Sequence, residues 1–212
     1  MKHFKLTSEF VVNVFGVKLF RIEATIDSKY AKKGDKGGFV EKEENLYGDA
    51  WVSGEAQVSG EARVYGNAQV YGNAQVSGDA QVYGNARVYG DAWVSGYAQV
   101  YGDAWVSGYA RVYGDAWVYG YAQVYGDAWV SGYAQVYGNA QVSKKVFTLN
   151  FKWQLTLSDL HIAYGCIMKT ILEWMEWLDS TEEFETKRDS PDFKIIEMAL
   201  RLAIEQHKLL NQ

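Results

Sequence analysis

The sequence predicts a mainly β protein that folds as a triangular parallel β-solenoid, and three observations indicate this fold class. One six-residue phrase, Val-(Tyr/Ser)-Gly-(Asp/Asn/Glu/Tyr)-Ala-(Trp/Gln/Arg), occurs sixteen times between Leu46 and Gln141, with Leu46 as the only replacement at the aliphatic position. Each phrase carries an alanine four residues after the aliphatic residue, and each contains a glycine at a fixed place between them. A strict short period of this kind is typical of stacked repeat architectures.

The phrase itself predicts one short strand and one turn. In the stretch Ala-x-Val, alanine and valine should point to the same side of a strand and therefore into the core. The glycine and the residue after it are expected to form a turn. Three phrases would close one triangular coil of eighteen residues, so residues 46–143 should form roughly five coils, with strands about 4.8 Å apart.

Residues 1–45 are expected to form an N-terminal β cap. A β-hairpin is predicted by two apolar segments on either side of Gly16. The first is Phe10–Val14, and the second has apolar residues at alternate positions over Phe20–Ile26. This hairpin would cover the open edge of the first coil. The glycine-rich segment 34–38 lacks the Lys-Ser/Thr ending of a phosphate-binding loop, so we interpret it as a turn that leads into the solenoid.

Residues 144–212 are expected to form a C-terminal strand followed by α-helices. Apolar residues alternate strictly from Phe147 to Leu157, which predicts one extended strand with a large apolar face. A helix should follow with Ile171, Met175 and Leu178 on one face and Leu172 beside it. The charged segment 181–189 is predicted to be a loop.

A second C-terminal helix is expected to begin near Pro191. Ser190 would cap it, and proline and aspartate would occupy its first turn. The side chains that this helix should bury are Ile195 or Ile196, Ala199, Leu202 and Ala203.

The repeated phrase resembles the left-handed parallel β-helix of hexapeptide-repeat proteins, many of which are trimeric acyltransferases. A closer resemblance is to short bacterial and bacteriophage proteins rich in Tyr-Gly-Asn-Ala-Gln-Val. The segments Lys33–Glu41, Glu44–Leu46 and His161–Cys166 are similar to theirs. The resemblance implies the left hand of the helix and a phage-encoded protein, and it is far more specific for fold than for function.

Composition excludes several functional classes. The chain has 212 residues, a net charge of −5 and a pI near 5.3, so it lacks the basic footprint of a nucleic-acid-binding protein. No apolar run is long enough to span a bilayer, and Asn13, Gly16 and Lys18 interrupt the mildly apolar segment Phe10–Phe20, so we expect no membrane association and no signal peptide. A single cysteine, Cys166, cannot form an internal disulfide and suits a cytoplasmic protein.

Catalytic motifs are absent from the repeat. Hexapeptide acyltransferases typically use a histidine as general base, whereas the phrases here contain neither histidine nor lysine; His3, His161 and His207 all lie outside them. No zinc spacing or nucleotide fingerprint is present. We therefore predict no cofactor, no metal and no enzymatic activity. Among the residues outside the repeat, His161 and Cys166 have the best case for a role, against the alternative that both are structural.

The outward-facing residues carry the remaining information. Sorted by an eighteen-residue period, one face has a tyrosine in every coil, whereas the other two faces mix serine and tyrosine. We predict a binding surface on the tyrosine-bearing face, consisting of Tyr65, Tyr83, Tyr101, Tyr119, Tyr137, Trp117 and Arg63. Two interpretations of the column stay open: cross-strand stacking or burial against a partner rod, and a platform for planar ligands such as bases or sugars.

The tryptophans follow a different period. Trp93, Trp105, Trp117 and Trp129 recur every twelve residues and so should spiral around the rod, which indicates tandem duplication of a two-phrase unit. That unit would place serine at position 119, where Tyr119 instead completes the tyrosine column.

Together these features predict a non-catalytic binding or assembly protein. It would act as a homo-oligomer, most simply a trimer, and hold a host protein or a small nucleotide-like ligand. Two alternatives are a hexapeptide acyltransferase and an acidic mimic of nucleic acid. The second is weakened because the phrases hold eight acidic residues against three arginines and their columns are interrupted by Asn and Tyr.

Overall fold

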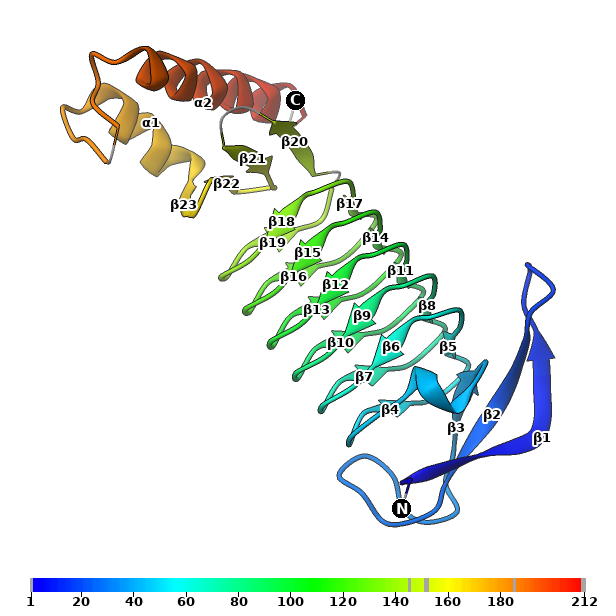
Figure 1. The fold of residues 1–212 in the computed structure, drawn as a ribbon. Coiled ribbons are helices and arrows are strands. Elements are labelled where there is room, and N and C mark those ends of the chain that lie inside the picture. Colours follow the sequence, from blue (N-terminus) through cyan, green and yellow to red (C-terminus); the bar gives the residue numbers. More distant parts are fainter. Residues whose placement is uncertain (1, 145, 151–152, 185, 211–212) are drawn as a thin grey trace.

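The molecule is an elongated rod with a β cap at one end and a mixed β and α cap at the other (Figure 1). The computed structural model describes residues 2–144, 146–150, 153–184 and 186–210. The middle of the rod is a parallel β-solenoid in which the chain visits three sheets in turn. The predicted mainly β solenoid fold is therefore confirmed.

Each wall of the rod is a sheet of two-residue strands, extended by the N-terminal strands in one case. The hairpin sheet contains, in spatial order, β1 (Phe4–Val12), β2 (Lys18–Ala24), β3 (Lys36–Val40), β5 (Gln57–Val58), β8 (Gln75–Val76), β11 (Trp93–Val94), β14 (Arg111–Val112) and β17 (Trp129–Val130). The tyrosine sheet contains β6 (Arg63–Val64), β9 (Gln81–Val82), β12 (Gln99–Val100), β15 (Trp117–Val118) and β18 (Gln135–Val136). The third sheet contains β4 (Trp51–Val52), β7 (Gln69–Val70), β10 (Arg87–Val88), β13 (Trp105–Val106), β16 (Gln123–Val124) and β19 (Gln141–Val142).

The phrase residues occupy the positions that their chemistry requires. The valines and alanines of the phrases form one continuous core and are almost completely buried. Each phrase glycine has a positive φ, between 61° and 74°, which a residue with a side chain rarely adopts. Consecutive coils also stack closely at the turns: a Cβ at Gly108 would lie 2.9 Å from the backbone nitrogen of Gly126. Glycine is therefore needed for both the turn and the close stacking.

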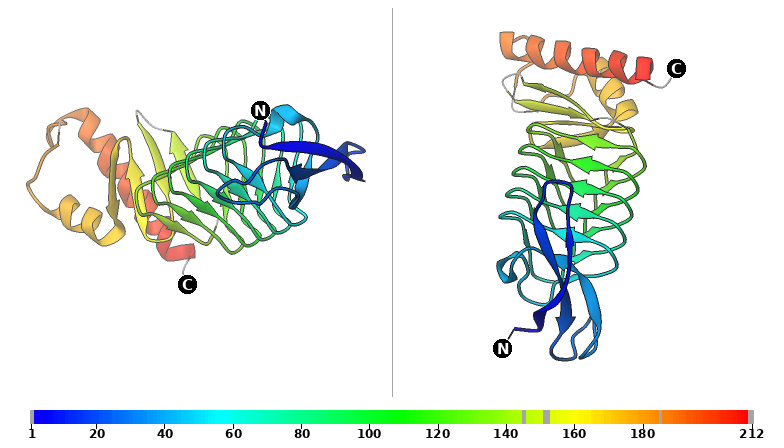
Figure 2. Two further views of the ribbon diagram at one scale, coloured as in Figure 1. Left: turned by 90° about the horizontal axis from the view of Figure 1, so that it is seen from below. Right: turned by 90° about the vertical axis from the view of Figure 1, so that its right-hand side faces the viewer.

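The N-terminal cap confirms the predicted hairpin. Strands β1 and β2 pair antiparallel and extend the hairpin sheet, and β3 pairs antiparallel with β2 and parallel with β5. The hairpin stands beside the rod in Figure 1 and lies in front of the coils in the right-hand view of Figure 2. A short 3-10 helix, η1 (Glu43–Asn45), leads into the first coil, where the buried Asn45 side chain donates to the carbonyls of Gly60 and Ala62.

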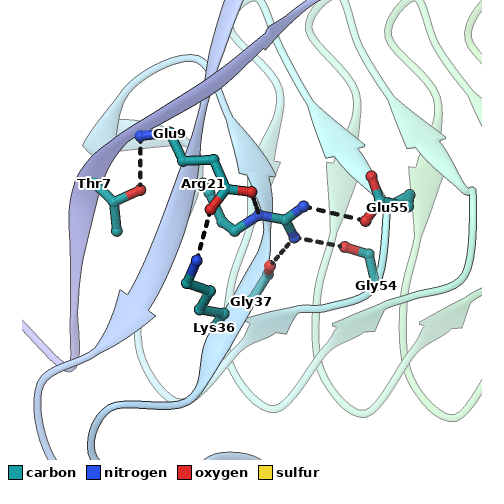
Figure 3. Close-up of polar contacts among 7 residues, drawn as sticks. All are labelled: Thr7, Glu9, Arg21, Lys36, Gly37, Gly54 and Glu55. Atoms are coloured by element: carbon teal, nitrogen blue, oxygen red, sulfur yellow. Dashed lines mark hydrogen bonds and ion pairs between the residues drawn. The ribbon is translucent and has the colours of Figure 1, made fainter.

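One arginine joins the hairpin to the solenoid. The Arg21 guanidinium donates to Glu9 Oε1 (2.6 Å), to the carbonyls of Gly37 (2.9 Å) and Gly54 (3.3 Å), and to Glu55 Oε1 (3.1 Å) (Figure 3). It therefore contacts β1, β3 and the turn of the first coil with one side chain.

The prediction that the whole segment 34–38 forms a turn is wrong. The turn includes Gly34, with φ +93°, but strand β3 begins at Lys36. Gly37 and Gly38 lie within this strand because no side chain fits there: a Cβ on Gly38 would come within 2.6 Å of the Ala56 carbonyl oxygen.

The C-terminal cap is a four-stranded antiparallel sheet covered by two helices. The sheet contains β20 (Phe147–Asn150), β21 (Gln154–Leu157), β22 (His161–Tyr164) and β23 (Ile167–Thr170), and the helices are α1 (Ile171–Asp179) and α2 (Pro191–Leu210). The predicted start of the second helix is confirmed, since the Phe193 N–H donates to Ser190 Oγ. The segment 181–189 forms no helix or strand in its described residues.

The single extended strand predicted over Phe147–Leu157 is wrong. The segment forms the antiparallel pair β20 and β21, in which Phe147 lies opposite Leu157. Residues 151–152 and the side chains of 147–150, which include part of the predicted apolar face, lie outside the described part of the chain. Leu155 and Leu157 are buried against the helices of the same chain.

The predicted apolar helix faces are only partly correct. Helix α1 buries Trp174, Trp177 and Leu178, whereas Met175 and Leu172 are exposed. Helix α2 leaves Leu202 exposed and buries Phe193, Ile196, Ala199, Leu200, Ala203 and Ile204. In both helices the largest available apolar side chains turn toward the cap sheet. None of the described helices is long and apolar enough to cross a membrane.

Candidate binding surface

The seven side chains predicted as a binding site all lie on one wall of the rod. Each of the five tyrosines directly follows a strand of the tyrosine sheet, and Arg63 and Trp117 are the outward residues of β6 and β15. We call this outer wall the tyrosine face. Parallel pairing places Arg63 beside Gln81, Gln99 beside Trp117, and Trp117 beside Gln135.

The tyrosine rings stack directly on one another. Consecutive ring centroids from Tyr65 to Tyr137 lie 4.8, 4.8, 5.0 and 5.3 Å apart, with interplanar angles of 15° or less. The ring faces inside the column therefore contact each other, and the ring edges are what these half-buried tyrosines leave accessible. A planar ligand cannot lie flat on an inner ring without separating two tyrosines, so the geometry favours the stacking interpretation of the column.

The hydroxyls of the column become more buried toward its C-terminal end. Tyr65 and Tyr83 donate to the side-chain oxygens of Gln81 (3.0 Å) and Gln99 (3.2 Å) in the next coil. The Tyr137 hydroxyl is buried without a hydrogen-bond partner among the described residues. Burial raises the pKa of Tyr65, Tyr83, Tyr101 and Tyr119, and it raises the pKa of Tyr137 to about 12.

Arg63 and Trp117 lie on the same face but far apart. They are separated by three coils, or about 14 Å at roughly 4.8 Å per coil. Arg63 and Trp117 therefore cannot hold the same small ligand, although one protein partner could contact both.

A hollow of about 320 Å³ lies where the tyrosine face meets the neighbouring corner of the rod. Its lining includes Tyr97, Asp115, Trp117 and Tyr133. Tyr97 and Tyr133 are each 63% exposed, and Trp117 is 40% exposed. Of these four residues, sequence reasoning selected only Trp117. The other three are turn residues that lie eighteen residues apart. Sorting turn residues by the eighteen-residue coil, as well as strand residues, places Tyr97, Asp115 and Tyr133 at one corner.

Two further cavities lie at the C-terminal end of the tyrosine face. One of about 380 Å³ is lined in part by Tyr119, Tyr137, Trp153 and Cys166. An apolar pocket of about 330 Å³ adjoins it, and both share Trp153, Gly165 and Cys166. The walls of this second pocket include Tyr164, Trp174, Trp177, Phe184, Phe193 and Ile196. The column of tyrosines therefore ends at an aromatic junction with the cap.

His161 and Cys166 are not brought together. His161 begins strand β22, whereas exposed Cys166 lies in the turn after this strand, and the two residues line different cavities. They do not form a nucleophile–base pair. His3 and His207 approach the backbone carbonyls of Ala50 (3.0 Å) and Asp159 (2.7 Å), which gives both a structural role. Within the described ranges, no group of three or more His, Cys, Asp or Glu side chains is arranged to hold a metal ion.

The repeat matches the model of a known protein family. The family model described as the YdcK Beta solenoid repeat matches residues 56–72, 68–81, 80–96, 98–114, 110–126 and 122–138. This chain is a β-solenoid repeat protein. The match lies within the solenoid and leaves both caps of the β-solenoid protein uncovered. No curated protein matches the chain.

Proposed function

We propose that this β-solenoid protein is a non-catalytic binding and assembly protein, and that the C-terminal half of the tyrosine face is its contact surface. One observation carries the proposal: exposed aromatic side chains border this half on both edges. Tyr97 and Tyr133 lie along one edge and Tyr121 along the other, each 63–66% exposed, with Trp117 between them. Exposed aromatic surface of this density is characteristic of protein interfaces.

A protein partner fits this surface better than a stacked nucleotide. The column offers ring edges, and hydroxyls other than that of Tyr137, because its ring faces are already occupied by neighbouring rings. Tyrosine edges and hydroxyls suit a protein surface, where apolar contact and hydrogen bonds alternate. The sequence likeness to bacteriophage proteins supports a host protein as the partner, held in the host cytoplasm by an oligomer of this chain.

The proposal is tested by replacing Tyr83, Tyr101 and Tyr119 with serine. Serine occupies the same phrase position at Ser53, Ser59 and Ser77, so the coils should still fold. Native mass spectrometry of freshly purified protein reports the oligomeric mass and any retained partner together. We expect the serine variant to have a lower oligomeric mass than the unaltered protein, or to lose a partner that the unaltered protein retains.

A matched control is available on the third sheet. Tyr71, Tyr89 and Tyr125 follow β7, β10 and β16, and the first two rings stack at 4.9 Å. Replacing these three with serine removes the same number of rings from a different face. Equal effects of the two triple variants, or no effect of either, would contradict a contact role for the tyrosine face. Turnover of acyl-CoA by the unaltered protein would favour the acyltransferase alternative.

A further inference from the structure

We propose that the corner hollow formed by Tyr97, Asp115, Trp117 and Tyr133 binds an alkyl guanidinium group, as carried by arginine. The inference rests on the proposed binding function and names the chemistry that one part of the contact surface recognises. A carboxylate beside aromatic rings is a favourable environment for an organic cation, because the ring faces and the carboxylate both carry negative potential.

The four side chains converge because of the eighteen-residue coil. Residues 97, 115 and 133 occupy the same corner in three successive coils, and the Tyr97 N–H donates to the Gly114 carbonyl at 2.9 Å. The two tyrosines are therefore two coils apart, or about 9.6 Å along the rod. A planar group that contacts both rings needs about 7–8 Å, from two contact distances of about 3.5–4.0 Å. The gap of about 9.6 Å is thus wide enough for a flat cation beside Asp115 and Trp117, in contact with one tyrosine ring at a time.

Three tryptophans of the rod already form cation–π contacts with arginine side chains of the same chain. The Arg87 guanidinium lies over the ring of Trp105 at 5.3 Å, and Arg111 lies over Trp129 at 5.4 Å and Trp93 at 6.0 Å. Trp117 instead has Gln99 and Gln135 on the neighbouring strands. Within the part of the chain that the structure describes, no cation lies over its ring. Trp117 therefore offers an external guanidinium the contact that Arg87 and Arg111 make with Trp93, Trp105 and Trp129.

Charge supports the same occupant. Asp115 is exposed and, among the described residues, has no hydrogen-bond or ion-pair partner. None of the described residues that line the hollow is basic, so none of them would repel a cation. Gln135 also lines the hollow and adds an acceptor oxygen for guanidinium N–H groups, whereas the Gln99 oxygen already accepts from the Tyr83 hydroxyl. In this hollow an arginine side chain can pair its charge with Asp115, place its planar face against an aromatic ring, and donate its N–H groups to acceptor oxygens.

The arrangement occurs once in the described solenoid. The unit Gly-Asp-Ala-Trp recurs at Asp49, Asp91, Asp103, Asp115 and Asp127, each two residues before a tryptophan. Among these aspartates, only Asp115 has a tyrosine both eighteen residues before it, at Tyr97, and eighteen residues after it, at Tyr133. The other four units therefore serve as internal controls.

The test uses the full chain and three probes: free arginine, a capped peptide with a central arginine, and the same peptide with citrulline, a neutral isostere. Binding is followed by isothermal calorimetry and by the NMR shift of the Trp117 indole N–H. We expect saturable binding of both arginine probes with a Kd on the order of 1 mM, and binding of the citrulline peptide at least about tenfold weaker. Tighter binding of the peptide than of free arginine would identify a partner protein as the source; equal affinity would identify a small guanidinium compound.

Each variant takes a residue that the repeat already uses at the same phrase position. We expect Asp115→Asn and Trp117→Gln each to weaken arginine binding by about fivefold to twentyfold. The matched changes Asp103→Asn and Trp105→Gln should leave it unaltered. The inference would be overturned if the changes at Asp103 and Trp105 weakened arginine binding as much as those at Asp115 and Trp117. It would also be overturned if the arginine and citrulline peptides bound equally, or if no probe bound saturably. In the last case the serine variants of the tyrosine column still decide whether the face binds a partner, so the two proposals fail separately.

Discussion

Tyr137 lies where the tyrosine column meets the cap, and its hydroxyl is buried without a partner among the described residues. Burial raises its pKa from 10.0 to about 12 in the folded protein. Between these two pH values the unfolded chain releases a proton that the folded chain still holds. The stability linked to Tyr137 is therefore complete below pH 10 and is lost as the pH rises to about 12.

We predict that Tyr137→Phe is neutral or slightly stabilising at pH 7, because it removes a buried polar group that makes no hydrogen bond. The variant should lose less stability than the unaltered protein between pH 10 and pH 12. Urea titrations at both ends of this range measure the difference, and Tyr113→Phe, at an exposed ring, is the control. A Tyr137→Phe variant as labile to alkali as the unaltered protein would refute this explanation.

Val100 lies at mid-rod and is completely buried, between Val82 and Val118 of the neighbouring coils. We predict that Val100→Asp abolishes folding of the solenoid, because the coil interior around Val100 holds only valine and alanine and offers no partner for a buried charge. Circular dichroism and a thermal melt test this. Gln99→Asp, one residue earlier and facing outward, should change the midpoint little. A near-normal melt for Val100→Asp would be incompatible with this core.

The N-terminal hairpin is joined to the solenoid through Arg21, whose side chain is 15% exposed. We predict that Arg21→Met releases the hairpin, because four hydrogen-bond acceptors lose their donor and the contact with the Phe39 ring, at 4.0 Å, is also changed. The expected cost is about 2–3 kcal/mol in the local opening free energy of β2 and β3, measured by amide hydrogen exchange.

A surface ion pair of the same hairpin provides the control. Lys5 lies 2.7 Å from Glu23, but the lysine side chain is 57% exposed. Lys5→Met should therefore cost less than about 1 kcal/mol. If Arg21→Met left the exchange of β2 and β3 as slow as before, the Arg21 contacts would not be what holds the cap in place.

The sequence was sufficient to predict the solenoid, the N-terminal hairpin and the start of the last helix, but not the packing of the C-terminal cap. The six-residue period specifies the strand, the turn and the buried residues together, so one phrase determines every coil. The C-terminal cap depends on non-repeated contacts: α1 buries Trp174 and Trp177 because the cap sheet lies on that side. The alternation from Phe147 to Leu157 does not show where the chain reverses, because both strands of the hairpin keep the same period. The hollow at Asp115 was missed because only strand residues were sorted by coil.

The rod as a whole leaves much aromatic surface uncovered, and this surface lies mainly in its C-terminal half. Tyr97, Tyr109, Tyr121 and Tyr133 are at least 63% exposed, and Trp105, Trp117 and Trp129 are close to 40%. The tip of the hairpin adds Val14 and Phe15, at 90% and 70%. Leu155 and Leu157, by contrast, are buried inside the cap, so these two residues cannot drive association. The exposed aromatic side chains therefore make the rod walls and the hairpin tip the first surfaces to test for self-association, beside the exposed Leu172 and Met198 of the cap helices.

We predict that the protein is a homo-oligomer at micromolar concentration, most simply a trimer, because a monomer would leave these aromatic side chains in water. Sedimentation velocity measures the mass directly. Two variants then locate the interface: Val14→Lys with Phe15→Lys charges the hairpin tip, and the serine triple at Tyr83, Tyr101 and Tyr119 alters the tyrosine face. If the walls form the contact, the serine variant dissociates and the lysine variant does not; if the hairpin reaches a neighbouring rod, the order is reversed. A monomer for the unaltered chain would contradict the prediction and leave the exposed aromatics available to a partner of another kind.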